Sequence, residues 1–542
     1  MLPRNGIPHP NVAMLLPAVL FQIDLLAERR TFGRFVFAAA LGPMLLAGGH
    51  PETVAHVAFV AALYALWVIL VDRARVALTL LAACLVAALL SAPVVAPFLE
   101  VLPHTSSYHE ASAQGRGGGT AFSDFKSLAL LVHPRLYGER PRPLWGHAVT
   151  ENVSGFAGIL GIGAWVALLI RAIVQRRWRE RETFFLLAAL LMFVIVADVP
   201  LVSAPFRELF SLALNARFRL PLAFFLAVLT AAFVQLVRRE WAIAAIAAGA
   251  AALALVLLKS DVPREAWLMA IPSAIVLALT ALLAIARLRP FVMPVLALAI
   301  YAELWGASHS WHPVTRGTDL FPRTPLIDAL LRARTNEPYR IAGIGAPLFP
   351  NTHVPFGFED VRAKDAITSA RYIDLVKTAT RHFDPYAYYQ KWNDPDTSLL
   401  DFLNVRWVLT EPGMELGDRA RYREIYAGPD GRVYENANVK PRFFASDAEV
   451  QIVTSRGDAY DLFVASRQRT QIVSSVAFWP GWRVSYNGRD IPTQVVYGAF
   501  LGFDVPPGHG VVKVRYVPMA FWGSLVLAGM TIAGLVIIRA RV

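Results

Sequence analysis

The chain has 542 residues, of which 56% are hydrophobic and 17% are charged, and its mean hydropathy is +0.46. These values lie outside the range of soluble globular domains and match those of multi-pass membrane proteins. A net charge of +12 would suit a nucleic-acid-binding protein, but the distribution of the basic residues argues against that class.

Eleven segments are apolar and long enough, at about 1.5 Å per helical residue, to cross or nearly cross a hydrocarbon core of about 30 Å. The first is the weakest, since Pro17, Gln22 and Asp24 interrupt it. The predicted helices cover residues 11–27, 33–48, 53–71, 76–97, 155–174, 183–199, 219–237, 241–258, 267–286, 290–306 and 519–538. They divide the chain into a membrane domain of about ten helices over residues 1–306 and a final helix within residues 516–542.

Basic residues alternate between the loops on the two sides of these helices. One set of loops holds sixteen arginines, whereas the opposite short loops hold five basic residues. The sixteen are Arg29, Arg30, Arg34, Arg73, Arg75, Arg171, Arg176, Arg177, Arg179, Arg181, Arg238, Arg239, Arg287, Arg289, Arg539 and Arg541; the five are Arg207, Arg217, Arg219, Lys259 and Arg264. Because basic residues accumulate on the cytoplasmic side, the first set and the C-terminus are assigned to the cytoplasm. The basic charge is therefore a topology signal, and no nucleic-acid partner is predicted.

This orientation places the loop of residues 98–154 and the segment 307–515 outside the cytoplasm. Residues 1–10 also fall outside the cytoplasm. They form no basic segment and precede a weak first span, which is an unusual start for a protein inserted into a membrane. We therefore expect further helices upstream of this sequence. The single cysteine, Cys84, lies within a predicted span, so no internal disulfide can form and the outer domain needs its own core.

The segment 307–515 mixes helical and strand patterns. Its first half has helical stretches, "TPLIDALLRAR" and "SARYIDLVKTATRHF", between short strands, "YRIAGIG" and "VRWVLT". In its second half, Asn487-Gly488 predicts a hairpin, because type I′ turns need positive φ at both central positions. "VVKVRYV" alternates apolar and polar residues, as a half-buried sandwich strand does. The expected fold is an α-helical polytopic membrane protein with a large extracytoplasmic α+β domain that ends in a β-sandwich.

Six segments carry a resemblance to a known family. They are "LLAGGHPET", "ARFRLP", "LLDFLNVRWVLT", "RVYENANVKPRFF", "AFWPGWRVSYNGRDIP" and "VPPGHGVVKVRYVP". This succession, followed directly by the last span, resembles the bacterial YfhO-like membrane proteins, which are relatives of the GT-C glycosyltransferases. The most specific part is Trp479-Pro480-Gly481-Trp482, followed by Tyr486-Asn487-Gly488 and Pro507-Gly508-His509.

The resemblance implies a GT-C-like transferase of the bacterial cytoplasmic membrane. Such an enzyme moves a sugar from a polyprenyl-phosphate donor to a cell-envelope glycan or polymer on the outer face. These folds carry an acidic residue, the expected general base, on a first outer loop that has no matching position here. The resemblance thus implies either a sequence that lacks its N-terminal part or a product that is inactive alone, so enzymatic activity stays open. The alternatives are an envelope protein whose outer domain binds glycan or a partner enzyme, and a lipid-linked sugar transporter.

A lipid-phosphate donor needs positive charge on the outer side, where the topology rule otherwise depletes it. Arg207, Arg217 and Arg219 break that rule and are the candidates for binding the donor phosphate. Arg217 and Arg219 precede Pro221 at a helix start, where guanidinium groups and free backbone amides can both meet phosphate oxygens. The alternative is that they anchor the helix to ordinary membrane lipid headgroups.

His50 and Glu52 are the candidates for catalytic groups. A carboxylate and an imidazole on a tight outer turn could accept protons, bind sugar hydroxyls or ligate a divalent metal. The alternative is a plain helix start, in which Gly48 and Gly49 allow the bend and Glu52 favours the positive end of the helix dipole.

Four more residues are candidates for contacts with the sugar or acceptor: Glu100, Glu151, Trp479 and Trp482. Ionisable groups within a membrane usually belong to a substrate or ion pathway or to an ion pair. At the hydrated membrane interface, however, most of the energetic cost of such a group disappears. The tryptophans can stack on a sugar ring, fill the sandwich core or lie at the headgroup level. The histidines lack HExxH or a similar spacing, so no metal site is assigned.

Overall fold

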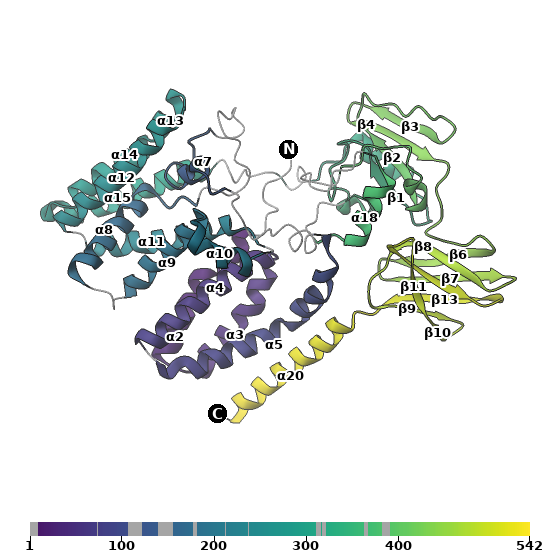
Figure 1. Cartoon of the computed structure of the whole chain (residues 1–542), viewed down its shortest axis with the longest axis horizontal. Coiled ribbons are helices and arrows are strands. Elements are labelled where there is room, and N and C mark those ends of the chain that lie inside the picture. Colours follow the sequence, from purple (N-terminus) through teal and green to yellow (C-terminus); the bar gives the residue numbers. More distant parts are fainter. Residues whose placement is uncertain are drawn as a thin grey trace. The chain divides into compact units, whose positions relative to one another are not determined.

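The chain forms two compact units, each described by itself (Figure 1). The helical unit is built within residues 1–92, 111–314 and 527–542, and the β-rich unit within residues 93–110 and 315–526. The computed structural model describes residues 9–72, 74–106, 122–138, 155–176, 181–211, 213–236, 238–309, 316, 321–362, 367–381 and 391–541.

Apolar helices make up the helical unit. They are α1 (His9–Ala13), α2 (Leu16–Glu28), α3 (Phe32–Ala47), α4 (Pro51–Trp67), α5 (Ala77–Val101), α8 (Ile159–Gln175), α9 (Arg181–Val196), α10 (Pro200–Leu209), α11 (Arg219–Leu236), α12 (Arg239–Lys259), α13 (Arg264–Met269), α14 (Ile271–Leu282), α15 (Arg289–Ser308) and α20 (Met519–Arg541). The 3-10 turn η6 (Asn215–Phe218) leads directly into α11, and the short helix α7 (Phe125–Leu128) precedes α8. Helices α5 and α20 cross the boundary between the two units.

Each of the eleven predicted membrane segments is helical, but they are not eleven full spans. Within the described residues, eight segments are long and apolar enough to cross a membrane, and a ninth is reached if the bent pair α9–α10 counts as one span. Helices α3 and α8 are apolar but have only 16 and 17 residues.

A bend of 85° separates α9 from α10, whereas the sequence predicts a helix over residues 183–199 and none over the residues of α10. Asp198 has a positive φ of 51°, and Pro200 begins α10. Proline disfavours the helical conformation of the residue before it, and Val199 is accordingly extended. The helix therefore ends at Val196.

The first half of the β-rich unit is a mixed sheet with short helices. Strand β1 (Arg340–Gly343) pairs parallel to β2 (Val405–Thr410), and β2 continues through β4 (Gly431–Asn436) to β3 (Tyr422–Gly428) in antiparallel pairs. The helices are α17 (Pro325–Arg332), α18 (Ala370–Ala379) and α19 (Leu399–Phe402). Helices α17 and α18 and strands β1 and β2 lie in the four stretches predicted from the sequence.

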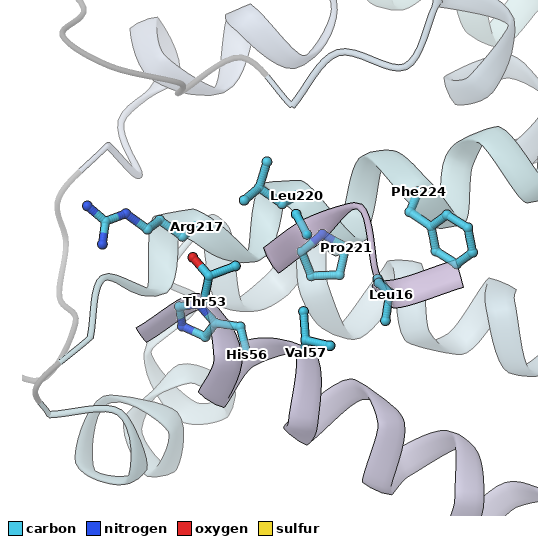
Figure 2. A pocket seen from close by; sticks show the side chains of 9 residues that line it. Leu16, Thr53, His56, Val57, Arg217, Leu220, Pro221 and Phe224 are labelled. Atoms are coloured by element: carbon cyan, nitrogen blue, oxygen red, sulfur yellow. The ribbon is translucent and has the colours of Figure 1, made fainter. Parts of the chain in front are cut away.

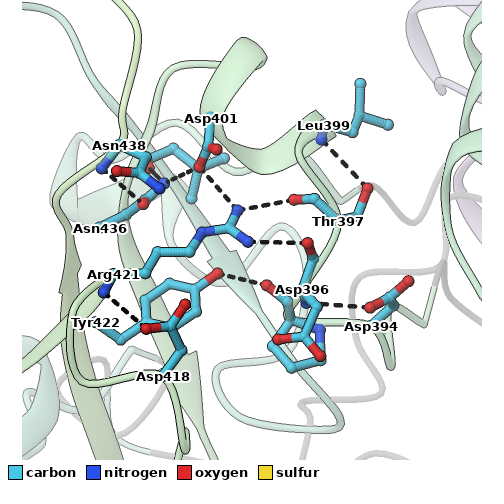
Figure 3. Close-up of polar contacts among 12 residues, drawn as sticks. Asp394, Asp396, Thr397, Leu399, Asp401, Asp418, Arg421, Tyr422, Asn436 and Asn438 are labelled. Atoms are coloured by element: carbon cyan, nitrogen blue, oxygen red, sulfur yellow. Dashed lines mark hydrogen bonds and ion pairs between the residues drawn. The ribbon is translucent and has the colours of Figure 1, made fainter.

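A buried arginine ties this sheet to the loop before α19 (Figure 3). Arg421 is 8% exposed and donates to the backbone carbonyls of Asp396 and Thr397 at 2.9 and 2.8 Å and to the Asp401 carboxylate at 2.8 Å. The same Asp401 oxygen accepts a hydrogen bond from the Asn436 side chain at 2.8 Å. The Asp401 carboxylate is thus satisfied by groups of the chain itself, and the cluster serves the fold.

The second half of the β-rich unit is a β-sandwich. One sheet has the order β10-β9-β13-β7-β6 and the other β11-β12-β8-β5. The strands are β5 (Phe443–Phe444), β6 (Ala448–Arg456), β7 (Ala459–Ser466), β8 (Thr470–Ala477), β9 (Trp482–Tyr486), β10 (Arg489–Ile491), β11 (Thr493–Val496), β12 (Phe500–Val505) and β13 (Gly508–Tyr516). Buried residues of both sheets, such as Val512 and Phe503, share one core.

Two sequence signals in the sandwich are confirmed. Asn487 and Gly488 have φ of 47° and 81° and join β9 to β10 as an antiparallel hairpin. In β13, Val512 and Val514 are fully buried while Lys513 is exposed.

Candidate functional site

The structure brings His50 and Glu52 together with Arg217, from segments 165 residues apart. His50 is the N-cap of α4, and its Nδ1 accepts a hydrogen bond from the Thr53 backbone amide at 3.1 Å. Pro51 takes the first helical position, where its missing N–H costs nothing. The helix start is therefore made by His50, and the Glu52 side chain is directed to another partner.

That partner is the turn η6. The Glu52 carboxylate forms an ion pair with the Arg217 guanidinium and accepts the Leu214 backbone N–H. Both side chains are partly buried, with 23% of Arg217 and 17% of Glu52 exposed. Because this pair is neither fully solvated nor sealed, its charges are weakly screened yet remain accessible.

The His50 imidazole is neutral at pH 7. Burial, with a further contribution from the Arg217 charge, lowers the pKa of His50 from 6.5 to about 4. Its Nε2 lies 3.5 Å from Nη1 of Arg217.

A small pocket lies beside this pair, between α2, α4 and the start of α11 (Figure 2). Its cavity volume is about 20 Å³, room for about one water molecule, and it opens to solvent. Thr53, His56 and the Arg217 side chain form its polar part, and Leu16 and Phe224 belong to its apolar wall. In Figure 2 the Thr53 and His56 side chains lie next to each other on α4.

Sequence reasoning missed His56. The residue is 1% exposed, and neither ring nitrogen has a hydrogen-bond partner within the described part of the chain. A signal existed, since residues four apart lie on one face of a helix and His56 follows Glu52 by four. Its position in the middle of an apolar segment concealed it.

Asn215 is a second buried polar residue that the sequence did not single out. It lies in η6 and is 2% exposed, and neither its amide nitrogen nor its oxygen has a partner among the residues that the structure describes. Buried polar groups are paired in the great majority of cases, so orphaned groups on both η6 and α4 mark this region for a ligand or water.

Arg219, which the sequence grouped with Arg217, has a different environment. It is 1% exposed, and its terminal nitrogens donate to the backbone carbonyls of Phe122 and Ser127 at 2.7 and 2.8 Å. Arg219 thus holds the segment around α7 against the start of α11.

Arg207 lies on α10 and is paired as well. Its Nη1 is 2.9 Å from a carboxylate oxygen of Asp198, at the bend between α9 and α10. The three arginines that the sequence proposes as phosphate ligands are therefore engaged with three different parts of the chain.

The remaining candidates belong to the β-rich unit or fall outside the described residues. Glu100 is exposed near the end of α5. The Trp479 ring lies 6.3 Å from that of His104. Trp482 is partly buried against the sandwich core and donates from Nε1 to the Ala477 carbonyl at 3.2 Å, which agrees with a packing role. Glu151 lies outside the described residues.

Metal ligation has no support in the described ranges, where no group of three or more His, Cys, Asp or Glu residues could hold a metal ion. His50 and Glu52 engage Thr53 and Arg217 instead. A divalent metal on this turn stays an untested expectation.

Comparison with known proteins identifies part of the chain. Residues 445–528 match the model of a family described as the bacterial membrane protein YfhO. The match covers the sandwich from the end of β5 to the first half of α20, and it confirms the resemblance inferred from the sequence. No curated protein and no solved structure matches the chain. Together with the eight apolar helical segments found among the described residues, the family match identifies a multi-pass membrane protein.

Proposed function

Since residues 445–528 carry the domain of the YfhO family of bacterial membrane proteins, we propose that the chain is a membrane glycosyltransferase. It transfers a sugar from a polyprenyl-phosphate donor to a cell-envelope glycan on the outer face of the cytoplasmic membrane. The observation that supports this function is the Glu52–Arg217 ion pair beside a pocket with apolar walls.

The location of the pair suits a lipid-linked donor. Glu52 lies in the first turn of α4, and Arg217 lies at the start of the apolar segment that runs through α11. A polyprenyl phosphate carries its charge where its apolar chain ends, at the boundary of the membrane. A guanidinium at this boundary can bind phosphate through two parallel hydrogen bonds, whereas in the resting state one of its nitrogens donates to the Glu52 carboxylate.

The resting pair implies an exchange of partners. The donor phosphate competes with Glu52 for the Arg217 guanidinium, and the exchange releases the carboxylate from its cation. Glu52 then serves as the general base, because a free carboxylate accepts a proton more readily than one held by an arginine. Donor binding thus precedes activation of the acceptor.

The transfer step follows from this arrangement. Glu52 removes the proton of an acceptor hydroxyl, and the hydroxyl oxygen forms a bond to the anomeric carbon of the donor sugar. The bond between that carbon and the phosphate oxygen breaks, and its electron pair leaves with the polyprenyl phosphate. Arg217 stabilises the charge that grows on the phosphate, and Glu52 later gives its proton to water.

His50 acts as a positioning residue in this scheme. It caps α4 and so fixes the first turn, from which Glu52 projects toward η6. Its neutral state leaves Arg217 as the cation of this cluster. Arg219 and Arg207 keep structural roles, because their guanidinium groups already hold the α7 segment and the α9–α10 bend.

The test is the substitution Arg217→Gln in the full-length protein, reconstituted in vesicles with a polyprenyl-phosphate sugar and envelope glycan. Loss of phosphate binding and charge stabilisation is expected to reduce transfer by at least ~100-fold, with membrane insertion unchanged. Arg469→Gln is the matched control, since it removes an arginine that pairs with Asp504 at 3.0 Å in the sandwich. Transfer by Arg217→Gln at the wild-type rate would overturn the proposal.

The same assay separates the alternatives. A wild-type protein that binds the glycan without transferring sugar is an envelope-binding protein. A wild-type protein that moves the lipid-linked sugar across the vesicle membrane without releasing it is a transporter. Either result contradicts the transferase proposal.

A further inference from the structure

The five-stranded sheet of the sandwich has an outer face that is turned away from the sandwich core, and one end of this face is basic. Arg515 of β13 is paired in register with Arg483 of β9 and, on its other side, with Ala459 of β7. Ala459 is paired in turn with Arg456 of β6. Residues paired in this way share a face of the sheet, and so does Lys513, two residues before Arg515. Four basic side chains therefore lie together on the outer face.

These basic side chains outnumber the acidic ones around them. The Asp461 carboxylate lies among them and is already engaged, since it pairs with Arg515 and accepts a hydrogen bond from the Thr454 hydroxyl at 2.7 Å. The turn after β6 adds one more acidic residue, the exposed Asp458. Three of the basic residues are exposed and form no ion pair within the part of the chain that the structure describes: Arg456, Arg483 and Lys513.

The stability of the sheet does not explain this arrangement. Arg483 and Arg515 stand directly opposite each other on antiparallel strands, where two like charges are destabilising. A surface that serves only solubility mixes charges of both signs and exposes few large apolar groups. On this face, however, Phe463 and Val511 are paired beside the basic residues and are 37% and 44% exposed. Basic side chains next to exposed apolar ones suit the surface of an anionic membrane.

The chain itself holds the basic end of the sheet near a membrane. Strand β13 ends at Tyr516, and α20, which is long and apolar enough to span a membrane, begins at Met519. Three residue steps limit the distance between these two Cα atoms to about 11 Å. The link is also fixed to the sandwich, because the Val517 amide donates to the Gly481 carbonyl at 2.8 Å. Arg515, the neighbour of Tyr516, is therefore held within reach of lipid headgroups.

The rest of the β-rich unit packs on the opposite side of this sheet. Its inner face shares a core with the second sheet of the sandwich, to which Val512 and Phe503 belong. The second sheet also packs against the mixed sheet, where Phe500 and Val408 lie in one cluster. The outer face is thus the side of the β-rich unit that is turned away from the mixed sheet.

We propose that the outer face of the five-stranded sheet docks on the anionic surface of the bilayer that α20 crosses. Arg456, Arg483 and Lys513 contact lipid phosphates, and Phe463 and Val511 lie in the headgroup layer. Because α20 tethers the sandwich to the same bilayer, docking is intramolecular and needs only contacts that are weak one by one. Docking fixes the orientation of the sandwich on the membrane. It uses a different surface from the Arg217 pocket and does not depend on sugar transfer.

The test measures how close this face lies to the bilayer in the full-length protein. Cys84→Ala removes the native cysteine, and Val511→Cys then places a fluorophore on the outer face. Ile425→Cys places the same fluorophore on β3 of the mixed sheet, at a position with a similar exposure of 36%. The protein is reconstituted in nanodiscs of phosphatidylcholine, with or without phosphatidylglycerol, that contain a trace of lipid with a quencher on its headgroup.

We expect stronger quenching at position 511 than at position 425. Phosphatidylglycerol should increase the quenching at position 511, and high salt should remove this increase, because salt screens exposed charges. Equal quenching at the two positions in anionic nanodiscs would contradict docking. Quenching at position 511 that is the same with and without phosphatidylglycerol would contradict the role of charge.

The variant that removes the charge combines Arg456→Gln, Arg483→Gln and Lys513→Gln. Each basic group near an anionic surface contributes a factor of about five to binding, so the equilibrium constant for docking should fall roughly a hundredfold. The three residues are exposed, so the fold should be retained, and circular dichroism checks this. Quenching at position 511 that this variant leaves unchanged would refute the proposal.

The matched control combines Arg419→Gln, Arg467→Gln and Arg469→Gln. These substitutions also remove three exposed basic charges from the β-rich unit, but from the loop before β3 and the turn after β7. This control should be quenched at position 511 as strongly as the protein with its arginines intact. An equal loss of quenching in the control and in the charge-removal variant would show that net charge, and not this face, is responsible, and would overturn the assignment.

Discussion

The exchange of partners at Arg217 makes an unusual prediction for the substitution Glu52→Gln. The amide keeps the length of the side chain and can still accept the Leu214 N–H, so the start of α4 is preserved. It removes the charge that holds Arg217 in the resting state. The variant is therefore expected to bind the donor more tightly and to transfer its sugar more slowly.

The partial burial of the pair sets the size of both effects. With 23% of Arg217 and 17% of Glu52 exposed, the pair lies between surface pairs, which contribute about 0–1 kcal/mol, and sealed pairs, whose disruption costs about 3–5 kcal/mol. If Glu52 competes with the donor phosphate for Arg217 by about 1–3 kcal/mol, removing its charge raises donor affinity roughly 5- to 150-fold. Loss of the general base reduces the rate of transfer by ~100- to 10,000-fold.

Two measurements on one preparation check this prediction. Donor affinity is measured by equilibrium binding of a non-transferable polyprenyl-phosphate sugar, and the rate by release of labelled sugar to the glycan in a single turnover. Arg423→Gln serves as a control, because it breaks the ion pair with Glu435 on the mixed sheet. A Glu52→Gln variant that transfers sugar at the wild-type rate would refute the assignment of Glu52 as the base, and unchanged donor affinity would refute the exchange.

Three other predictions concern parts of the chain that support the site. Arg219→Gln is expected to loosen the segment around α7, since two charge-assisted hydrogen bonds to Phe122 and Ser127 are lost, and faster protease cleavage near residues 122–138 would report it. Arg421→Leu is expected to destabilise the β-rich unit by about 3–5 kcal/mol, because the Asp401 carboxylate loses its buried cation. Chemical unfolding followed by intrinsic fluorescence measures this loss of stability, and a loss below about 1 kcal/mol would count against the role of Arg421. Because the pKa of His50 is lowered from 6.5 to about 4, the unfolded chain binds a proton between these values that the folded chain does not. Stability should therefore fall as the pH is lowered from 6.5 toward 4, and His50→Asn, which keeps a cap acceptor, should show a smaller fall in thermal unfolding across this range.

Much of the fold follows from local patterns in the sequence. Apolar segments of sufficient length are helical because a helix satisfies its own backbone hydrogen bonds, which the membrane core cannot do. The hairpin at Asn487-Gly488 follows from the positive φ that its turn requires. The short helix α10 escaped prediction, because the predicted helix ends at residue 199 and α10, with only 10 residues, is too short to read as a membrane span.

The candidate site was predictable in composition but not in arrangement. His50 and Glu52 stand out as polar residues in a turn, yet nothing in the sequence connects that turn to Arg217. Arg217 and Arg219 were grouped because they are close in sequence, whereas residues two apart on a helical turn face different directions. One accordingly meets Glu52 and the other the carbonyls of Phe122 and Ser127.

The most direct test of donor binding beside Arg217 is to map where a polyprenyl phosphate binds. A photoactivatable analogue, with its reactive group on the first isoprene unit, is crosslinked to the full-length protein in nanodiscs, and the labelled peptides are identified by mass spectrometry. We expect labelling of the pocket wall at Leu16, Val57 and Phe224, suppressed by excess farnesyl phosphate and weakened in Arg217→Gln. Labelling confined to other helices, or pocket labelling that excess farnesyl phosphate does not reduce, would contradict it.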